Sequence, residues 1–338
     1  MADTKGGRTL RALGWILGIG AGLALGAYVA FQVSPWPAAL LIRHAFERNA
    51  RAISAALTPH VPAGVAAQLD LPYDALDPHA RLDVFYPVTL EPGQAAPLTI
   101  VWVHGGAWIS GSKADIAGYA RILAAHGYTV VGVDYALAPA HTYPTPVRQT
   151  NSALGYLQAH AARLHVDPSR LVLAGDSGGA HIVAQLANLI TSAAYARRLG
   201  IVPAIGSAQL RGLILYCGAY DTVHVNLAGA FGGFLRTVLW SYSGSRNFAA
   251  DPAFASAAVI EYLTAAFPAS FISAGNADPL ASQSQAFAAA LAAHGVRTDA
   301  LFFPHDYRPA LPHEYQFNLD SAAGRLALER SLEFLGTL

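Results

Sequence analysis

Sulfur and charge are scarce in this sequence of 338 residues. Cys217 is the only cysteine, which excludes an internal disulfide and a cage of thiolate metal ligands, and we expect it to be a small core residue on a strand. The 21 basic and 21 acidic residues cancel, and no basic run is interleaved with aromatic residues, so a nucleic-acid-binding surface is excluded. The hydrophobic share of 54% provides ample material for a large core.

A long uncharged stretch lies near the N-terminus. Residues 12–33 hold 22 positions without a charged side chain. About this many residues let a helix cross a hydrocarbon layer of roughly 30 Å. We therefore predict an uncleaved transmembrane helix. A cleaved signal peptide is the alternative, although the apolar part of such peptides is usually only about 7 to 15 residues long.

Basic residues are distributed unevenly around this stretch. Lys5, Arg8 and Arg11 precede it within residues 1–11, whereas the first basic residue after it is Arg43. Because Lys and Arg favour the cytoplasmic side of a membrane, this asymmetry predicts a short cytoplasmic N-terminus and a single-pass anchor. The catalytic domain is then expected on the extracytoplasmic side.

Four glycines recur at every fourth position of the predicted span, namely Gly14, Gly18, Gly22 and Gly26. On a helix they form a stripe of small residues, which allows two membrane helices to approach closely. A homodimer through this stripe is one hypothesis. Chance placement in a chain rich in alanine and glycine is the other.

Residues 34–70 form a juxtamembrane region that contains a predicted amphipathic helix at 36–57. Its apolar face consists of Ile42, Phe46, Ile53 and Leu57. Its charged residues off that face are Arg43, Glu47, Arg48 and Arg51. Such a helix could lie on anionic headgroups or cover the globular domain, and the sequence does not separate these alternatives.

Residues 71–338 alternate between short apolar runs and longer helical stretches. The runs are rich in β-branched and aromatic residues and cover 82–87, 98–105, 128–135, 170–177, 211–218, 269–275 and 299–304. This pattern is typical of an α/β domain with a mostly parallel sheet flanked by helices. A long stretch rich in glycine and aromatic residues, at about 218–267, predicts a cap over a binding site.

The segment "AGDSGG" contains one serine between glycines, directly after a predicted strand and before a predicted helix. Gly175 and Gly179 allow the sharp turn, which lifts the hydroxyl of Ser177 above the sheet edge. The amide of Gly178 then points to where an oxyanion would form. This pattern predicts a nucleophile elbow.

A serine nucleophile needs a base, and the base needs an acid that orients it. Asp278 follows one predicted strand, and both His305 and His313 follow the last one. The resulting order of serine, aspartate and histidine is that of the α/β-hydrolase topology. This order alone leaves both histidines open.

The chain from about residue 82 onward resembles α/β-hydrolases of the hormone-sensitive-lipase-like esterase group, and it is similar to the BD-FAE type. The segments that carry the resemblance are "HGGAW" from His104, "DYALAP" from Asp134, "GDSGG" from Gly175, "DPL" from Asp278 and "PHEY" around His313. The resemblance implies that Asp278 is the acid and His313 the base, with His305 as the alternative.

The "HGGAW" loop follows a predicted strand, where free amides can face a reacting carbonyl. Similar enzymes use this loop as part of the oxyanion hole. The expected oxyanion residues are therefore Gly105, Gly106, Ala107 and Gly178. We expect His104 to brace the loop rather than transfer a proton.

These features predict a serine hydrolase that cleaves small-molecule carboxylic esters with a neutral, apolar acyl group. No cofactor and no metal ion are expected, because His305, His313 and Glu314 lack a recognised ligand spacing. One alternative is an amide hydrolase, since "HGGAW" also resembles the corresponding loop of arylformamidases. Another is a membrane-tethered interaction protein that keeps the fold without the chemistry.

Overall fold

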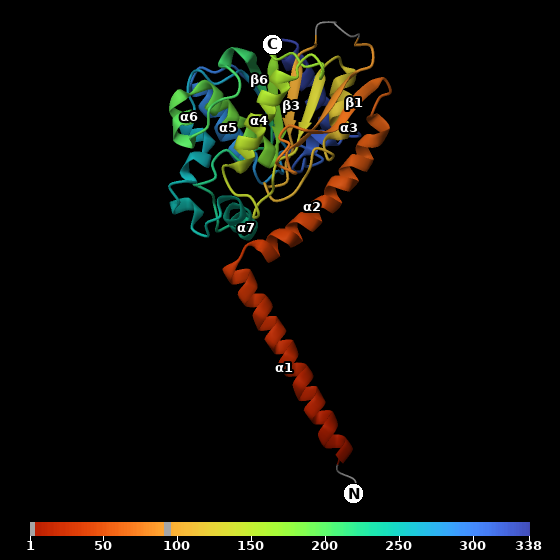
Figure 1. Ribbon diagram of the computed structural model, residues 1–338, viewed down its shortest axis with the longest axis vertical. Coiled ribbons are helices and arrows are strands. Elements are labelled where there is room, and N and C mark those ends of the chain that lie inside the picture. The colour runs from red at the N-terminus through yellow and green to blue at the C-terminus, as the bar shows by residue number, and fades with distance from the viewer. Residues whose placement is uncertain (1–3, 91–95) are drawn as a thin grey trace.

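A long helix stands apart from a globular α/β domain in the computed structural model, which describes residues 4–90 and 96–338 (Figure 1). This helix, α1 (Thr4–Val33), contains an apolar stretch at Leu13–Val33 of which nothing is buried. By length and composition it could cross a membrane, and a signal sequence would pass the same test. Within the expected N-terminal segment 1–11, residues 1–3 lie outside the described residues.

The four glycines of the predicted stripe face open space, with no atom beyond their own helix backbone within 4 Å of the position that a Cβ would occupy. Nothing in the described chain occupies this stripe. The homodimer through Gly14, Gly18, Gly22 and Gly26 stays a prediction.

The domain is built on an eight-stranded sheet in the order β1-β2-β4-β3-β5-β6-β7-β8. The strands are β1 (Val65–Pro72), β2 (Arg81–Pro87), β3 (Thr99–Val103), β4 (Thr129–Val133), β5 (Leu171–Asp176), β6 (Leu210–Tyr216), β7 (Ser270–Ala274) and β8 (Thr298–Phe302). Strands β3 to β8 pair in parallel, whereas β2 is antiparallel to both of its neighbours. The predicted mostly parallel sheet is confirmed.

Helices cover both faces of the sheet. They are α2 (Trp36–Leu57), α3 (Ala117–Ala125), α4 (Thr145–Ala159), α5 (Ser177–Thr191), α6 (Ala193–Leu199), α7 (Gly232–Ser243), α8 (Ala281–Ala293) and α9 (Ala322–Leu335). Short 3₁₀ helices lie at Thr58–His60, Ser207–Gln209, Phe248–Ala250, Ala255–Ala257, Val259–Tyr262 and Tyr315–Phe317. Alternate residues of β3 show why two faces need cover: Val101 and Val103 join one core cluster with α4, α5 and α8, while Ile100 and Trp102 join another with α3 and α9.

Strand β1 begins inside the segment 34–70 that the sequence analysis assigned to the juxtamembrane region. The boundary expected at 70/71 therefore falls within a strand of the sheet. Hydrophobic periodicity does not predict this strand, because it lies at the edge of the sheet and its residues are half-buried or exposed. Its pairing with β2 also shifts in register between Gln68 and Leu71. The remaining division into domains stays a prediction.

Helix α2 packs its apolar face on the globular domain. Ile42 and Phe46 lie against the larger core cluster, and Leu57 is buried. Arg43, which periodicity placed off this face, is half-buried and donates to two backbone carbonyls, from Nε to Ile109 at 2.6 Å and from Nη2 to Ala138 at 3.0 Å. That placement of Arg43 was wrong, because helical periodicity does not register acceptors on a neighbouring loop.

The segment expected to form a cap, 218–267, contains α7 and three of the 3₁₀ helices. Helix α7 packs against α2, with the rings of Phe46 and Phe234 5.9 Å apart. Tyr143 donates its backbone amide to the carbonyl of Tyr242 at 2.7 Å, which attaches the end of α7 to the body of the domain.

Candidate active site

Ser177 sits at the sharp turn from β5 to α5. Its φ of 51° is the left-handed conformation expected of a strained elbow, and the side chain is 8% exposed. The flanking glycines are required by close backbone contacts: a Cβ on Gly175 would lie 2.6 Å from the carbonyl carbon of Gly179, and one on Gly179 would collide with the carbonyl oxygen of Val103. The local sequence therefore forces the hydroxyl to the carboxyl edge of the sheet.

Asp278 and His313 meet at the same edge. Asp278 follows β7 and His313 follows β8, and the two come together with Nδ1 of His313 3.0 Å from Oδ2 of Asp278. The Asp278 side chain is fully buried and also accepts from the amide of Leu280 at 2.7 Å. His313 keeps 32% of its side chain exposed and lines the same cavity as Ser177.

His305, the alternative base, lies elsewhere. It is exposed, it does not line the cavity, and its backbone oxygen accepts from the side-chain amide of Asn276 at 3.1 Å. The structure thus pairs Asp278 with His313 and leaves His305 on the surface.

Cys217 is buried as expected, but it lies just after β6, with a φ of 46°, rather than within the strand. Its Sγ and ligand atoms of Asp278 and His313 all lie within 4.8 Å of one another. Burial raises the pKa of the Cys217 thiol to about 11. Burial opposes a charged His313, yet the contacts with Cys217 and Asp278 raise its pKa above the usual value overall.

A second group of possible metal ligands, Asp221, His224 and Glu261, is largely exposed and lies outside the cavity. Exposed acidic groups of this kind are common without an ion. Neither group resembles a closed or catalytic zinc site.

Glu314 and Asp176 are two acidic residues beside Ser177 and His313 to which the sequence patterns assigned no role in the site. Oε1 of Glu314 lies 3.9 Å from Nε2 of His313, and Glu314 adopts a left-handed φ of 59°. Asp176 is buried and accepts from the indole of Trp102 at 2.7 Å. Burial, followed by the charge of Glu314, raises the pKa of Asp176 well above its usual value. The only feature of the sequence that points to these two residues is that they are adjacent to Ser177 and His313.

The "HGGAW" loop faces the elbow. Gly106 and Ala107 both have positive φ, at 103° and 52°, and a Cβ on Gly178 would lie 3.4 Å from the amide nitrogen of Ala107. Within the described residues, neither the Gly106 nor the Ala107 amide donates to another protein group. A Cβ on Gly105 would collide with a carboxylate oxygen of Asp176, so this expected oxyanion residue lies close against the Asp176 side chain.

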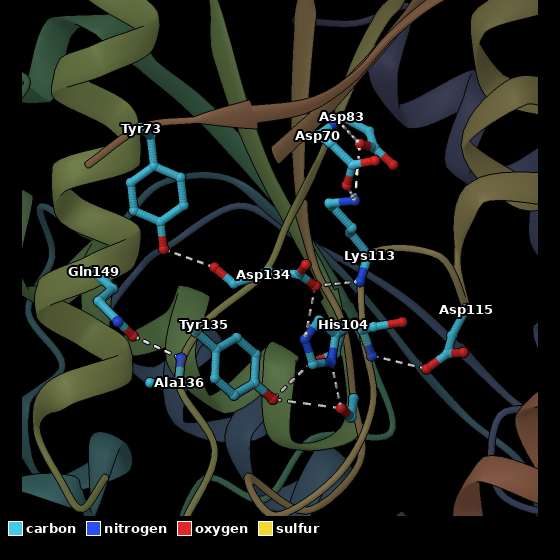
Figure 2. A network of polar contacts seen from close by, with 12 residues as sticks. Asp70, Tyr73, Asp83, His104, Lys113, Asp115, Asp134, Tyr135, Ala136 and Gln149 are labelled. Atoms are coloured by element: carbon cyan, nitrogen blue, oxygen red, sulfur yellow. Dashed lines mark hydrogen bonds and ion pairs between the residues drawn. The ribbon is translucent and has the colours of Figure 1, made fainter. Parts of the chain in front are cut away.

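A buried polar network holds this loop against the sheet (Figure 2). Lys113 bonds through Nζ to Asp70 at 2.7 Å and to Asp83 at 3.0 Å, and its backbone amide donates to Asp134 at 2.6 Å. Figure 2 shows Asp134 also facing His104, whose Nε2 is 3.8 Å from Oδ1. Lys113 therefore connects the edge strands with the segment that follows the loop.

His104 sits inside this network and braces the loop. Its Nδ1 donates to the carbonyl of Gly105 at 2.8 Å, and its ring stacks on Tyr135 at 4.4 Å. The hydroxyl of Tyr135 donates to the carbonyl of His104 at 3.1 Å. Burial lowers the pKa of His104 to about 4, so it is neutral at pH 7 and has no role as a proton carrier.

Trp108 connects the loop to the cap. Its indole donates to Nδ1 of His181 at 3.2 Å, and Nε2 of His181 in turn donates to the carbonyl of Ala257 at 2.8 Å. Trp108 also stacks on Tyr242 with ring centroids 4.5 Å apart. A continuous set of buried contacts therefore connects the "HGGAW" loop with the segment 218–267.

A cavity of about 400 Å³ lies above these residues. Its lining comprises the loop from His104 to Trp108, the elbow, His313, Glu314, and side chains of α2 and α7. Within the described part of the chain, no Lys or Arg lines it. The arrangement places a possible nucleophile, a base with its acid, and free amides around one apolar space.

A protein-family profile described as alpha/beta hydrolase fold matches residues 100–311. Among curated proteins, the chain is 27% identical to the esterase LipQ of Mycobacterium tuberculosis over 83% of this chain and 65% of that protein. It is 28% identical to an acetyl esterase of Salmonella choleraesuis over 63% of this chain and 65% of that protein. The chain thus spans slightly less than two thirds of the length of these relatives.

Solved structures show the same fold. Esterase B from Lactobacillus rhamnosis, with an inhibitor bound, superposes with a TM-score of 0.75 at 23% identity, covering 89% of this chain and 95% of that one. The carboxylesterase EstE1 from a metagenomic library gives a TM-score of 0.64 at 21% identity, covering 89% and 97%. The resemblance proposed from the sequence motifs is confirmed.

Proposed function

Because the chain belongs to the α/β-hydrolase family, we propose that it hydrolyses carboxylic esters through Ser177, His313 and Asp278. The observation that carries this proposal is the 3.0 Å contact between His313 Nδ1 and Asp278, which leaves Nε2 free in the cavity that Ser177 also lines. The esterase names of the similar curated proteins support the same reaction class.

In the acylation step, Oγ of Ser177 attacks the ester carbonyl carbon while its proton moves to Nε2 of His313. Asp278 accepts from Nδ1 and stabilises the imidazolium. The tetrahedral intermediate collapses when the bond from carbon to the alcohol oxygen breaks and that oxygen takes the proton from Nε2. The alcohol leaves, and an acyl-serine remains.

Water completes the cycle. It attacks the acyl-serine and gives a proton to Nε2, and that proton returns to Oγ as the carboxylic acid is released. The amides of Gly106, Ala107 and Gly178 are the donors that we assign to the oxyanion. Each such donor is worth about 2.7 to 4 kcal/mol of transition-state stabilisation.

The lining of the cavity supports a neutral substrate with an apolar acyl group. It combines aromatic side chains with the acidic side chains of Asp115, Asp176 and Glu314, and within the described chain it offers no Lys or Arg to an anionic ligand. Transfer of an apolar acyl group from water into such a pocket is favourable. The mechanism needs no cofactor.

Helix α1 is proposed as a single-pass anchor, with the catalytic domain on the extracytoplasmic side. Support comes from its largely apolar stretch of 21 residues, of which nothing is buried, and from the basic residues that precede it. Mass spectrometry of the purified protein from membranes separates the anchor from a cleaved signal peptide, because only the anchor retains residues 1–33.

The function is tested by labelling the full chain with a fluorophosphonate, which reacts with activated serines. Wild type should be labelled, and Ser177→Ala should lose labelling and at least about 10³-fold of its p-nitrophenyl butyrate hydrolysis. Folded wild type that resists labelling would instead support the interaction protein without catalysis. Faster turnover of N-formylkynurenine than of esters would identify an amide hydrolase.

A further inference from the structure

Two helices form the wall of the cavity that faces away from the sheet. Helix α2 contributes Phe46, Asn49, Ala50 and Ile53, and the segment of α7 contributes Phe231, Phe234, Leu235 and Val238. The Phe231 and Phe234 rings lie 4.6 Å apart, and Phe234 reaches the ring of Phe46. Apart from Asn49, the residues that form this wall are apolar.

The same two helices lie at the end of α1 (Figure 1). Only Ser34 and Pro35 separate α1 from α2. Arg246, just beyond α7, donates from Nη1 to the carbonyl of Gln32 at 2.8 Å and stacks over Trp240 of α7 at 5.3 Å. The end of α1 is therefore connected to both helices of the cavity wall, to α2 through Ser34 and Pro35 and to α7 through Arg246.

The surface around this junction exposes large apolar side chains, whereas polar side chains are expected on a surface that faces water. At the start of α2, Trp36, Leu40 and Leu41 are 41%, 50% and 65% exposed. Phe231 is 38% exposed and lies within an uncharged stretch at 225–235. Exposed apolar residues gathered next to an apolar helix indicate contact with a hydrocarbon phase.

The exposed face of α2 changes character along its length. Beyond Leu41 the exposed residues become charged, with Glu47, Arg48 and Arg51. Arg48 lies about 10 Å farther along the helix than Leu41, at 1.5 Å per residue. Figure 1 shows α2 running away from α1 along the side of the domain. This order matches a helix that leaves the acyl region of a bilayer and passes its headgroups.

We propose that the substrate is an uncharged lipid ester of the diacylglycerol kind, and that its acyl chain enters the cavity directly from the bilayer between α2 and α7. This inference rests on the proposed esterase function and on the proposed anchor. The bilayer is the partner of the apolar surface because α1 continues into it, and the lack of cations in the described lining favours an uncharged lipid.

The test uses full-length protein in phosphatidylcholine vesicles that contain dioleoylglycerol. Fatty-acid release and hydrolysis of soluble p-nitrophenyl acetate are measured on the same sample, both normalised to the protein that floats with the vesicles. Leu41→Asp places a charge on the proposed membrane surface, outside the cavity lining. Ala52→Asp, on the exposed far part of α2, is the matched control.

Leu41→Asp should lower dioleoylglycerol hydrolysis at least tenfold and leave p-nitrophenyl acetate hydrolysis within twofold of wild type. Ala52→Asp should change neither rate by more than twofold. If Leu41→Asp leaves both rates unchanged, or lowers both equally, direct entry from the bilayer is wrong, while the esterase function stands. If wild type hydrolyses p-nitrophenyl acetate but not dioleoylglycerol, the substrate class is wrong. Absence of both activities in wild type contradicts the proposed function itself.

Discussion

The floor and the roof of the cavity are built in different ways. The floor consists of the elbow, the "HGGAW" loop and the segment around His313, and buried polar contacts such as those of Lys113 and His104 fix it. The roof consists of α2 and α7, which meet mainly through aromatic rings. Directional hydrogen bonds hold atoms in one geometry, whereas apolar contacts tolerate repacking.

This difference separates chemistry from selectivity. A reaction that depends on free amides and one imidazole nitrogen needs positions held within a fraction of an ångström. Selection of an acyl chain needs shape and apolar area, which a roof of phenylalanine and leucine provides. Changes in the floor should therefore act on turnover or folding, and changes in the roof on substrate preference.

Asp278→Asn should give the largest effect, because an amide can hold the wrong histidine tautomer and cannot stabilise the imidazolium. We expect kcat for p-nitrophenyl butyrate to fall about 10³- to 10⁴-fold with an unchanged circular dichroism spectrum. His305→Asn is the control, since His305 is exposed and lies outside the cavity. A loss upon His305→Asn equal to that of Asp278→Asn would overturn the assignment of the base.

Lys113→Ala tests the network that holds the floor. It leaves the buried carboxylate of Asp83 without its cation, so the free energy of unfolding should fall by about 3 kcal/mol in urea titrations. Arg51→Ala removes an exposed ion pair with Glu47 and should change the free energy of unfolding by no more than about 0.5 kcal/mol. Equal effects of the two substitutions would show that the network has no special importance.

Phe234→Ala tests the roof. It removes apolar contact with Phe46 and Phe231, so kcat/KM for p-nitrophenyl octanoate should fall about tenfold while that for the acetate changes little. Leu76→Ala, at a remote and exposed leucine, serves as the control. An equal loss of kcat/KM on both substrates would show instead that Phe234 affects turnover, as residues of the floor do.

Glu314→Gln should give the smallest effect, a displacement of the pH profile. The base is active only as neutral imidazole, and the raised pKa of His313 places the acid limb of kcat/KM above the usual histidine pKa of 6.5. The negative charge of Glu314 is one of the contacts that raise this pKa, so its removal should move the limb to lower pH. Measurements of kcat/KM from pH 5 to 9 show the direction in which the acid limb is displaced. A displacement to higher pH would contradict the prediction.

Local patterns in the sequence predicted the floor well and the roof poorly. The elbow at Ser177 follows from the glycine spacing between a predicted strand and a predicted helix, and Asp278 follows from its place after a strand. The choice of His313 over His305 depended on family resemblance, because two histidines after one strand look alike until the loop is folded. Edge strand β1 was missed since its burial is incomplete.

Contacts between distant segments explain the other omissions. Glu314, Asp176 and Cys217 acquire their setting only when the ends of β5, β6 and β8 converge, and no spacing within one segment encodes that. The roof depends on how α2 docks against α7, two helices almost 200 positions apart along the chain. Periodicity gave the apolar face of α2 but not the side chains that it meets.

The two hydrogen bonds of Arg43 indicate where the chain should be truncated to remove α1 and retain the globular domain. They join α2 to carbonyls at Ile109 and Ala138, on either side of the active-site loops. Deleting residues 1–33 leaves these two hydrogen bonds intact, whereas a deletion that extends through residue 57 removes them together with the side of the cavity that α2 forms. Truncation for crystallography or assay should therefore stop before Trp36.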